Sequence, residues 1–248
     1  MADLFLSAKQ KLARVTEIIA AMEADIAAFN ATDPYTRLVE TDPEGLEQDH
    51  AIALTRPLPE GLADLTLEAV EALRAALDHA VFAASKAAGS RRLIDTCFPI
   101  AESREDLAKV MDEKCKGVPP EVARMIRETE PYKGGNELIW ALAVIPRAER
   151  YQLIAPIGSV DSGLTFVGNE VAPRVRWDAR KKVIELGVFP IHGKFRRDIS
   201  VRFSAAFGAV EGYEERPVVP LLRAAAEEVQ RILDDLEKET GRLGLTAD

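Results

Sequence analysis

The stretch EALRAALDHAVF, from Glu71 to Phe82, places an arginine and a histidine five positions apart in an otherwise apolar segment. An arginine can neutralise a phosphate and a histidine can transfer protons near neutral pH, so Arg74 and His79 suit chemistry on a phosphate. Successive residues of an α-helix turn by about 100°, which separates these two side chains by about 140°. One helix therefore cannot direct both at the same phosphate, and a catalytic site needs a second helix, from this chain or from another copy.

A structural interpretation accounts for the same residues. Glu71, Arg74 and Asp78 are spaced i, i+3 and i+7, so Arg74 can form ion pairs on either side. His79 lies on the opposite flank among alanines, where a partly buried histidine needs a hydrogen bond to a neighbouring element. The face between the two flanks carries Leu73 and Leu77, which we expect to be buried. The catalytic and the structural interpretations both stay open.

The spacing of an arginine, four residues and a histidine on the second helix of an antiparallel pair resembles the HEPN superfamily of RNases. The resemblance implies that two protomers bring their motifs together at a dimer interface. Arg74 would then hold the scissile phosphate, and His79 would act in acid–base transfer for the 2′-hydroxyl without a metal. In HEPN motifs a polar residue often follows the arginine directly, whereas this chain has Ala75.

A second resemblance covers most of the chain. The segments LRAALDHAVFA, CFPIAES, PYKGGNELIWAL and VEGYEERPVVPLLRAAAEEVQRIL are similar to landmarks of a widespread group of uncharacterised bacterial and phage-associated proteins. In that group a later segment tends to carry Asp-Lys-His-Arg before a Leu-rich stretch. Here it appears as PRAERYQL, where Arg147, Glu149 and Arg150 keep a second charged cluster but the histidine is missing. The resemblance implies that a site shared by this cluster and His79 is altered in this chain.

The remaining motifs indicate neither a metal nor a cofactor. The three histidines, His50, His79 and His192, are scattered without the spacing of a metal site. Cys97 and Cys115 could be bridged, but free thiols are the simpler expectation for a cytosolic protein. Nucleophile elbows, Walker loops and dinucleotide fingerprints are absent from the sequence. A small basic patch in PIHGKFRRD reads as a solvated polar loop.

Composition favours a globular cytoplasmic protein. Apolar residues make up 47% and charged residues 29% of the 248 residues, a balance that excludes a disordered chain. The formal net charge of −9 disfavours broad binding to a phosphate backbone, although a local basic pocket is still allowed. Neither a secretory signal nor a run of about 18 apolar residues is present, so we expect no export and no membrane span.

Hydrophobic periodicity predicts the elements. Helical patterns cover about 4–30 and 60–88, and the second ends at Gly89, a suitable C-terminal cap. Two short extended runs at about 35–56 predict a β-hairpin between these helices. Several short helices follow over about 100–153, extended segments begin near 154, and a final amphipathic helix starts at Val218.

The predicted fold class is therefore α+β: two long antiparallel helices with an inserted β-hairpin, short middle helices, an antiparallel sheet and a C-terminal helix. The expected division is a mainly helical part, 1–153, and a part with the sheet and last helix, 154–248, packed together as one unit.

Two functions from different classes fit this sequence. The first is a non-catalytic intracellular protein that binds a protein partner or small ligand between its helical layer and its sheet. The second is a metal-independent RNase of toxin or phage-defence type, acting through Arg74 and His79. A homodimer through the long helices is expected under the second and allowed under the first. RNA is a partner under the RNase hypothesis alone, and a membrane is a partner under neither.

Overall fold

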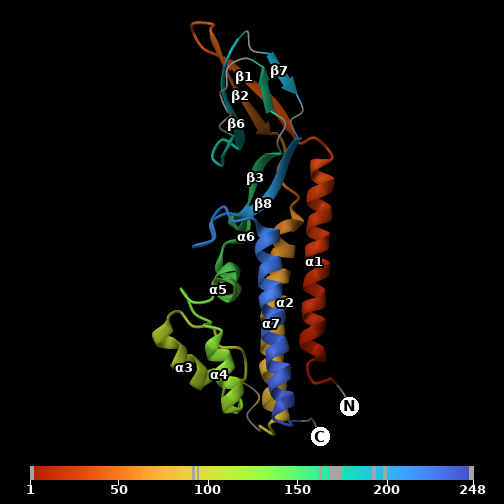
Figure 1. The fold of residues 1–248 in the computed structure, drawn as a ribbon, viewed down its shortest axis with the longest axis vertical. Helices are drawn as coiled ribbons and strands as arrows, with labels where there is room; N and C mark the ends of the chain where they lie inside the picture. The colour runs from red at the N-terminus through yellow and green to blue at the C-terminus, as the bar shows by residue number, and fades with distance from the viewer. Residues whose placement is uncertain are drawn as a thin grey trace.

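The computed structural model describes residues 3–90, 93, 95–161, 164–167, 175–191, 194–197 and 200–245. Figure 1 shows an elongated molecule with the helices at one end and most strands at the other. No helix within these ranges is long and apolar enough to cross a membrane.

Two long helices joined by a β-hairpin form the first third of the chain, as the sequence predicts. Helix α1 spans Leu6–Asn30 and helix α2 spans Gly61–Ala87. Between them, strand β1, Tyr35–Thr41, pairs antiparallel with strand β2, Glu47–Leu54. The helices run antiparallel and pack against each other (Figure 1). They do so because each carries an apolar stripe that must be removed from water.

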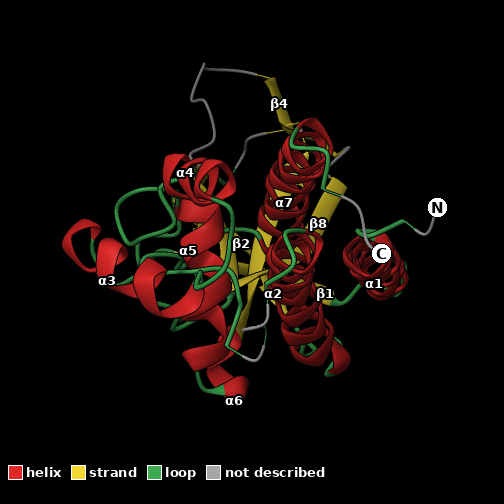
Figure 2. Ribbon diagram, turned by 90° about the horizontal axis from the view of Figure 1, so that it is seen from below, coloured by secondary structure: helices red, strands yellow, loops and turns green. Residues whose placement is uncertain are grey.

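The C-terminal helix completes the helical body. Helix α7, Val218–Arg242, packs against both α1 and α2. Seen along the long axis, α2 and α7 lie centrally, α1 lies on one side and the short helices lie on the other (Figure 2). α2 is therefore covered on several sides, which explains why both Leu73 and Leu77 are fully buried, as predicted.

Five short helices occupy the middle of the chain. They are α3 (Arg104–Lys114), α4 (Pro120–Glu128), α5 (Glu137–Val144), the 3-10 helix η1 (Ile145–Arg147) and α6 (Arg150–Leu153). Local sequence sets their starts. The Ser103 hydroxyl accepts the Asp106 amide, and the Asn136 side chain accepts the Ile139 amide. Pro120 opens α4, where a missing amide proton costs nothing.

The remaining strands form antiparallel pairs, but in three sheets rather than the single sheet expected. They are β3 (Ile154–Asp161), β4 (Leu164–Val167), β5 (Arg176–Asp178), β6 (Val183–Pro190), β7 (Lys194–Arg197) and β8 (Ser200–Phe207). One sheet has the order β1-β2-β6-β5, and the other two are β3-β8 and β4-β7. The hairpin recruits β6 through long-range pairing, which no local pattern encodes.

One local expectation was wrong. The segment Lys194–Arg197 was expected to lie in a solvated loop, yet it forms strand β7 against Leu164–Val167. A charged segment can still pair through its backbone, because ladder hydrogen bonds use the main chain. His192, from the same stretch, lies outside the described residues.

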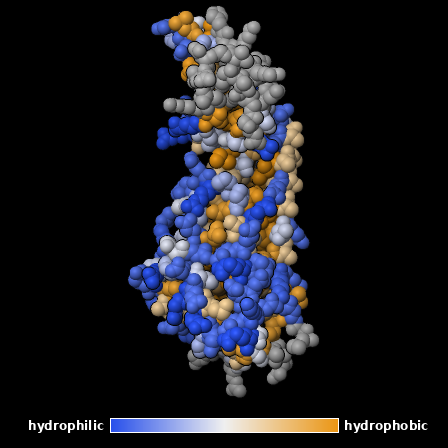
Figure 3. All heavy atoms as spheres, in the orientation of Figure 1, coloured by the Kyte–Doolittle hydropathy of each residue, from blue (hydrophilic) through white to orange (hydrophobic). Residues whose placement is uncertain are grey.

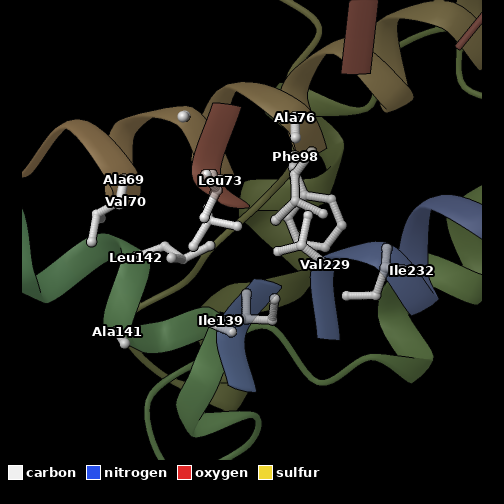
Figure 4. Packing of buried hydrophobic residues seen from close by; sticks show 14 of the residues in the cluster. Ala69, Val70, Leu73, Ala76, Phe98, Ile139, Ala141, Leu142, Val229 and Ile232 are labelled. Atoms are coloured by element: carbon white, nitrogen blue, oxygen red, sulfur yellow. The ribbon is translucent and has the colours of Figure 1, made fainter. Parts of the chain in front are cut away.

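Two hydrophobic cores hold the elements together. The larger lies between the long and short helices and includes Phe98, Trp140 and Leu142. In Figure 4 the Phe98 ring lies between Ala76 of α2 and Val229 of α7. The smaller lies among the strands, around Ile52 and Phe203. Pairing of β2 with β6 crosses residue 154, so the two expected parts are in contact, and the division itself stays a prediction.

Candidate functional site

His79 connects α2 to the start of α1. Its Nδ1 atom lies 2.8 Å from the hydroxyl oxygen of Ser7, and the ring is half-buried. A shallow hollow of about 490 Å³ opens beside it, with Phe82 and Lys86 among the lining residues. Arg74 is not among the residues that line this hollow. The hydrogen bond to Ser7 is what the structural interpretation of His79 requires.

Arg74 faces a different neighbour. Its Nε atom lies 3.9 Å from Asp78, one turn further along α2. Asp78 in turn accepts a 2.8 Å hydrogen bond from the Phe98 backbone amide. Burial raises the pKa of the Asp78 carboxyl, although this amide and the Arg74 charge oppose the shift. Arg74 and Asp78 therefore hold the segment that precedes α3 rather than sharing a cleft with His79.

The four segments quoted for the second resemblance contact one another. Asp78 of the first binds Phe98 of the second. The third and fourth are joined by a 2.6 Å hydrogen bond from the Tyr213 hydroxyl to the Glu137 carbonyl oxygen, and by a 3.0 Å ion pair between Arg216 and Glu137. Burial raises the pKa of Tyr213 to about 12, so this hydroxyl stays a donor at neutral pH. These polar residues act as connections between segments.

The second charged cluster does not converge on one point. Arg147 lies over the Trp140 ring, with its guanidinium carbon 5.4 Å from the ring centre, and forms a 2.7 Å ion pair with Glu102. Arg150 forms an ion pair with Asp64 in the first turn of α2. Glu149 is exposed and precedes α6. Asp64 and His79 are fifteen residues apart on α2, about 22 Å along its axis, so Arg150 and His79 do not share a site.

The sequence did not indicate a larger hollow where the helical body meets the strands. It encloses about 710 Å³, and we call it the junction hollow. Its lining consists of Leu54–Glu60, Ala63, Arg150, Tyr151, Ile154, Pro156 and Lys182. These residues come from the connection between β2 and α2, from α6 and β3, and from the turn before β6 (Figure 1). Arg150 was predicted as part of a charged cluster, whereas Arg56, Tyr151 and Lys182 carried no signal.

Neither a metal nor a disulfide is built into the described part of the chain. No group of three or more His, Cys, Asp or Glu side chains there could hold a metal ion. Cys97 and Cys115 are free thiols, as the sequence favoured. Burial raises the pKa of Cys115 to about 12 and also raises that of Cys97, so both stay protonated at neutral pH and neither is an activated nucleophile.

Comparison with known proteins found no matching family model, no similar curated protein and no similar solved structure. Function therefore has to be inferred from the geometry and charge of the molecule itself.

Proposed function

We propose that this chain is a non-catalytic binding protein whose ligand occupies the junction hollow. The observation that carries the proposal is the hollow itself, a space of about 710 Å³ between the helical body and the strands. Ligand pockets are typically of this size, mostly apolar, and located where layers or domains meet. Its walls come from three separate stretches of sequence, so its shape depends on the whole fold.

The contacts of Arg74 and His79 argue against the RNase hypothesis. A metal-independent RNase needs a phosphate-binding arginine and an acid–base histidine at one transition state. Here Arg74 lies against Asp78, while His79 lies against Ser7 on another side of α2. A homodimer through the long helices stays a prediction, which the mass of the protein in solution tests. The ligand proposal needs no second copy.

A variant that fills the junction hollow tests the proposal. Ala63 lines the hollow from the first turn of α2 and is half-buried, so Ala63→Trp places an indole in the space. Ala20→Trp, at an exposed position of α1, is the matched control. A fragment library screened by ligand-observed NMR should give binders that both the unchanged protein and the control retain and that Ala63→Trp loses. Binders that Ala63→Trp retains in full, or no binders at all, would overturn the proposal.

A further inference from the structure

The junction hollow is positively charged although the chain as a whole is acidic. Three of its lining residues are cations, Arg56, Arg150 and Lys182, and one, Glu60, is an anion. The whole chain has a formal net charge of −9. A second large hollow, of about 1050 Å³, is lined by two arginines and two carboxylates, so its charges balance. The excess of cations is therefore particular to the junction hollow.

The cations of the junction hollow are weakly committed to carboxylates of the protein. The Arg56 guanidinium donates to the carbonyl and hydroxyl oxygens of Thr32, which are neutral acceptors. Among the described residues no carboxylate forms an ion pair with Arg56 or Lys182. Arg150 is paired with Asp64, but both side chains are more than half exposed, and such pairs contribute little and exchange readily.

The start of α2 adds to this positive potential. The helix has 27 residues and begins at Gly61, directly beside the lining residues Glu60 and Ala63. No side chain caps its first turn. The aligned peptide dipoles of a helix place partial positive charge at its N-terminus, which favours an anion there.

The rest of the lining is apolar or aromatic. Leu54, Leu58 and Ile154 are half-buried in the wall, and Pro57, Pro59 and Pro156 add carbon surface. Tyr151 also lines the hollow and is 77% exposed, so one ring face is open to a ligand. In Figure 3 hydrophobic atoms gather in the middle of the molecule, beside a largely hydrophilic helical surface. An inorganic anion alone would leave this apolar surface uncovered.

We infer that the ligand is an amphipathic anion: a small molecule with a carboxylate, sulfonate or phosphate group and an apolar, preferably aromatic, body. The anionic group lies against Arg56 and Lys182, which can donate charge-assisted hydrogen bonds to it. The body lies against Tyr151 and the prolines. This inference rests on the proposed function, because it assumes that the junction hollow is the binding site.

Two fluorescent probes with the same aromatic body but different charge test the inference. Anilinonaphthalene sulfonate is an anion, and N-phenylnaphthylamine is its neutral counterpart. We expect the sulfonate to bind about tenfold more tightly, which corresponds to one charge-assisted contact. Arg56→Gln with Lys182→Gln should remove most of that preference without weakening the neutral probe. Phenyl phosphate should displace the sulfonate, and benzamide should not.

A matched variant controls for net charge. Lys181→Gln with Arg124→Gln removes the same two charges from residues that do not line the hollow. It should leave both probes unaffected. If both probes bind equally and Ala63→Trp removes both, the hollow is a binding site but the anionic ligand is wrong. If Ala63→Trp removes neither probe, the hollow is not the site, and the proposed function fails with the inference.

Discussion

Two regions of α2 use their polar residues in different ways. Around Arg74, Asp78 and His79, the polar atoms are engaged with other elements, through the Phe98 amide and the Ser7 hydroxyl. At the start of the same helix, Arg56 and Lys182 face a hollow without a carboxylate partner among the described residues. A motif that draws attention in a sequence can therefore be fully used by the fold. Charges without a partner are the better indication of a ligand.

The largest expected effect lies beneath the motif. Leu77 is fully buried between the helices, so Leu77→Ala should lower the free energy of unfolding by about 2–5 kcal/mol, through lost burial and the cavity left behind. Urea denaturation measures this change. Leu46→Ala, at a side chain that is 62% exposed, should cost less than about 1 kcal/mol. Equal losses for the two variants would mean that the α2 core is not packed as described.

The next effect concerns the anchor of the segment before α3. Asp78→Ala removes the acceptor of the Phe98 amide and should cost about 1–3 kcal/mol, because a partly buried donor is left without a partner. Asp78→Asn keeps one acceptor oxygen and should cost less. Chemical denaturation of both variants separates the hydrogen bond from the charge. An Ala variant as stable as the Asn variant would show that this hydrogen bond does not hold the segment.

The pH dependence of stability gives a smaller effect with a defined sign. The pKa of Asp78 is raised above its ordinary value of 3.8 by burial, so the folded state holds this proton more tightly than the unfolded state. The stability of the unchanged protein relative to Asp78→Asn should therefore fall as the pH rises from 3.8 through the raised pKa, and then stay constant. Urea denaturation at a series of pH values measures the difference.

Asp42 in the β1–β2 turn provides a control of opposite sign. The backbone amides of Glu47 and Leu46 donate to its carboxylate and lower its pKa. Stability relative to Asp42→Asn should be fully present at neutral pH and should be lost as the pH falls below 3.8 through the lowered pKa. If both differences change in the same direction with pH, the environment assigned to Asp78 is wrong.

The sequence predicted the helices well because their determinants are local. The apolar stripe around Leu73 and Leu77, Gly89 after α2 and the Asn136 cap each act within a few residues. The division into three sheets could not be predicted, because pairing of β2 with β6 depends on residues more than a hundred positions apart. The junction hollow was missed for the same reason. Arg56, Tyr151 and Lys182 meet only in the folded chain, and no spacing among them signals a site.

The bond between His79 and Ser7 should have a modest effect on stability. His79→Ala and Ser7→Ala should each cost about 0.5–1.5 kcal/mol, and the double variant should cost less than the sum, because both remove the same hydrogen bond. We expect no RNA cleavage by the unchanged protein in the presence of EDTA. Cleavage that leaves a cyclic phosphate and is lost in His79→Ala at unchanged melting temperature would contradict the structural role and restore the RNase hypothesis.

The smallest effect on stability is expected in the junction hollow, where the effect on binding should be largest. Among the described residues no hydrogen bond or ion pair joins the Lys182 side chain to the rest of the protein, so Lys182→Gln should change the free energy of unfolding by less than about 0.5 kcal/mol. The adjacent Lys181 lies 4.0 Å from Asp178 and 3.8 Å from Glu185, and Lys181→Gln should cost up to about 1 kcal/mol. Binding of the anionic probe should show the reverse order, with a loss for Lys182→Gln and none for Lys181→Gln. A lysine that contributes nothing to folding but much to anion binding is placed for the ligand. If Lys182→Gln instead destabilises the protein more than Lys181→Gln, Lys182 has a structural role, and the contrast between the two regions of α2 disappears.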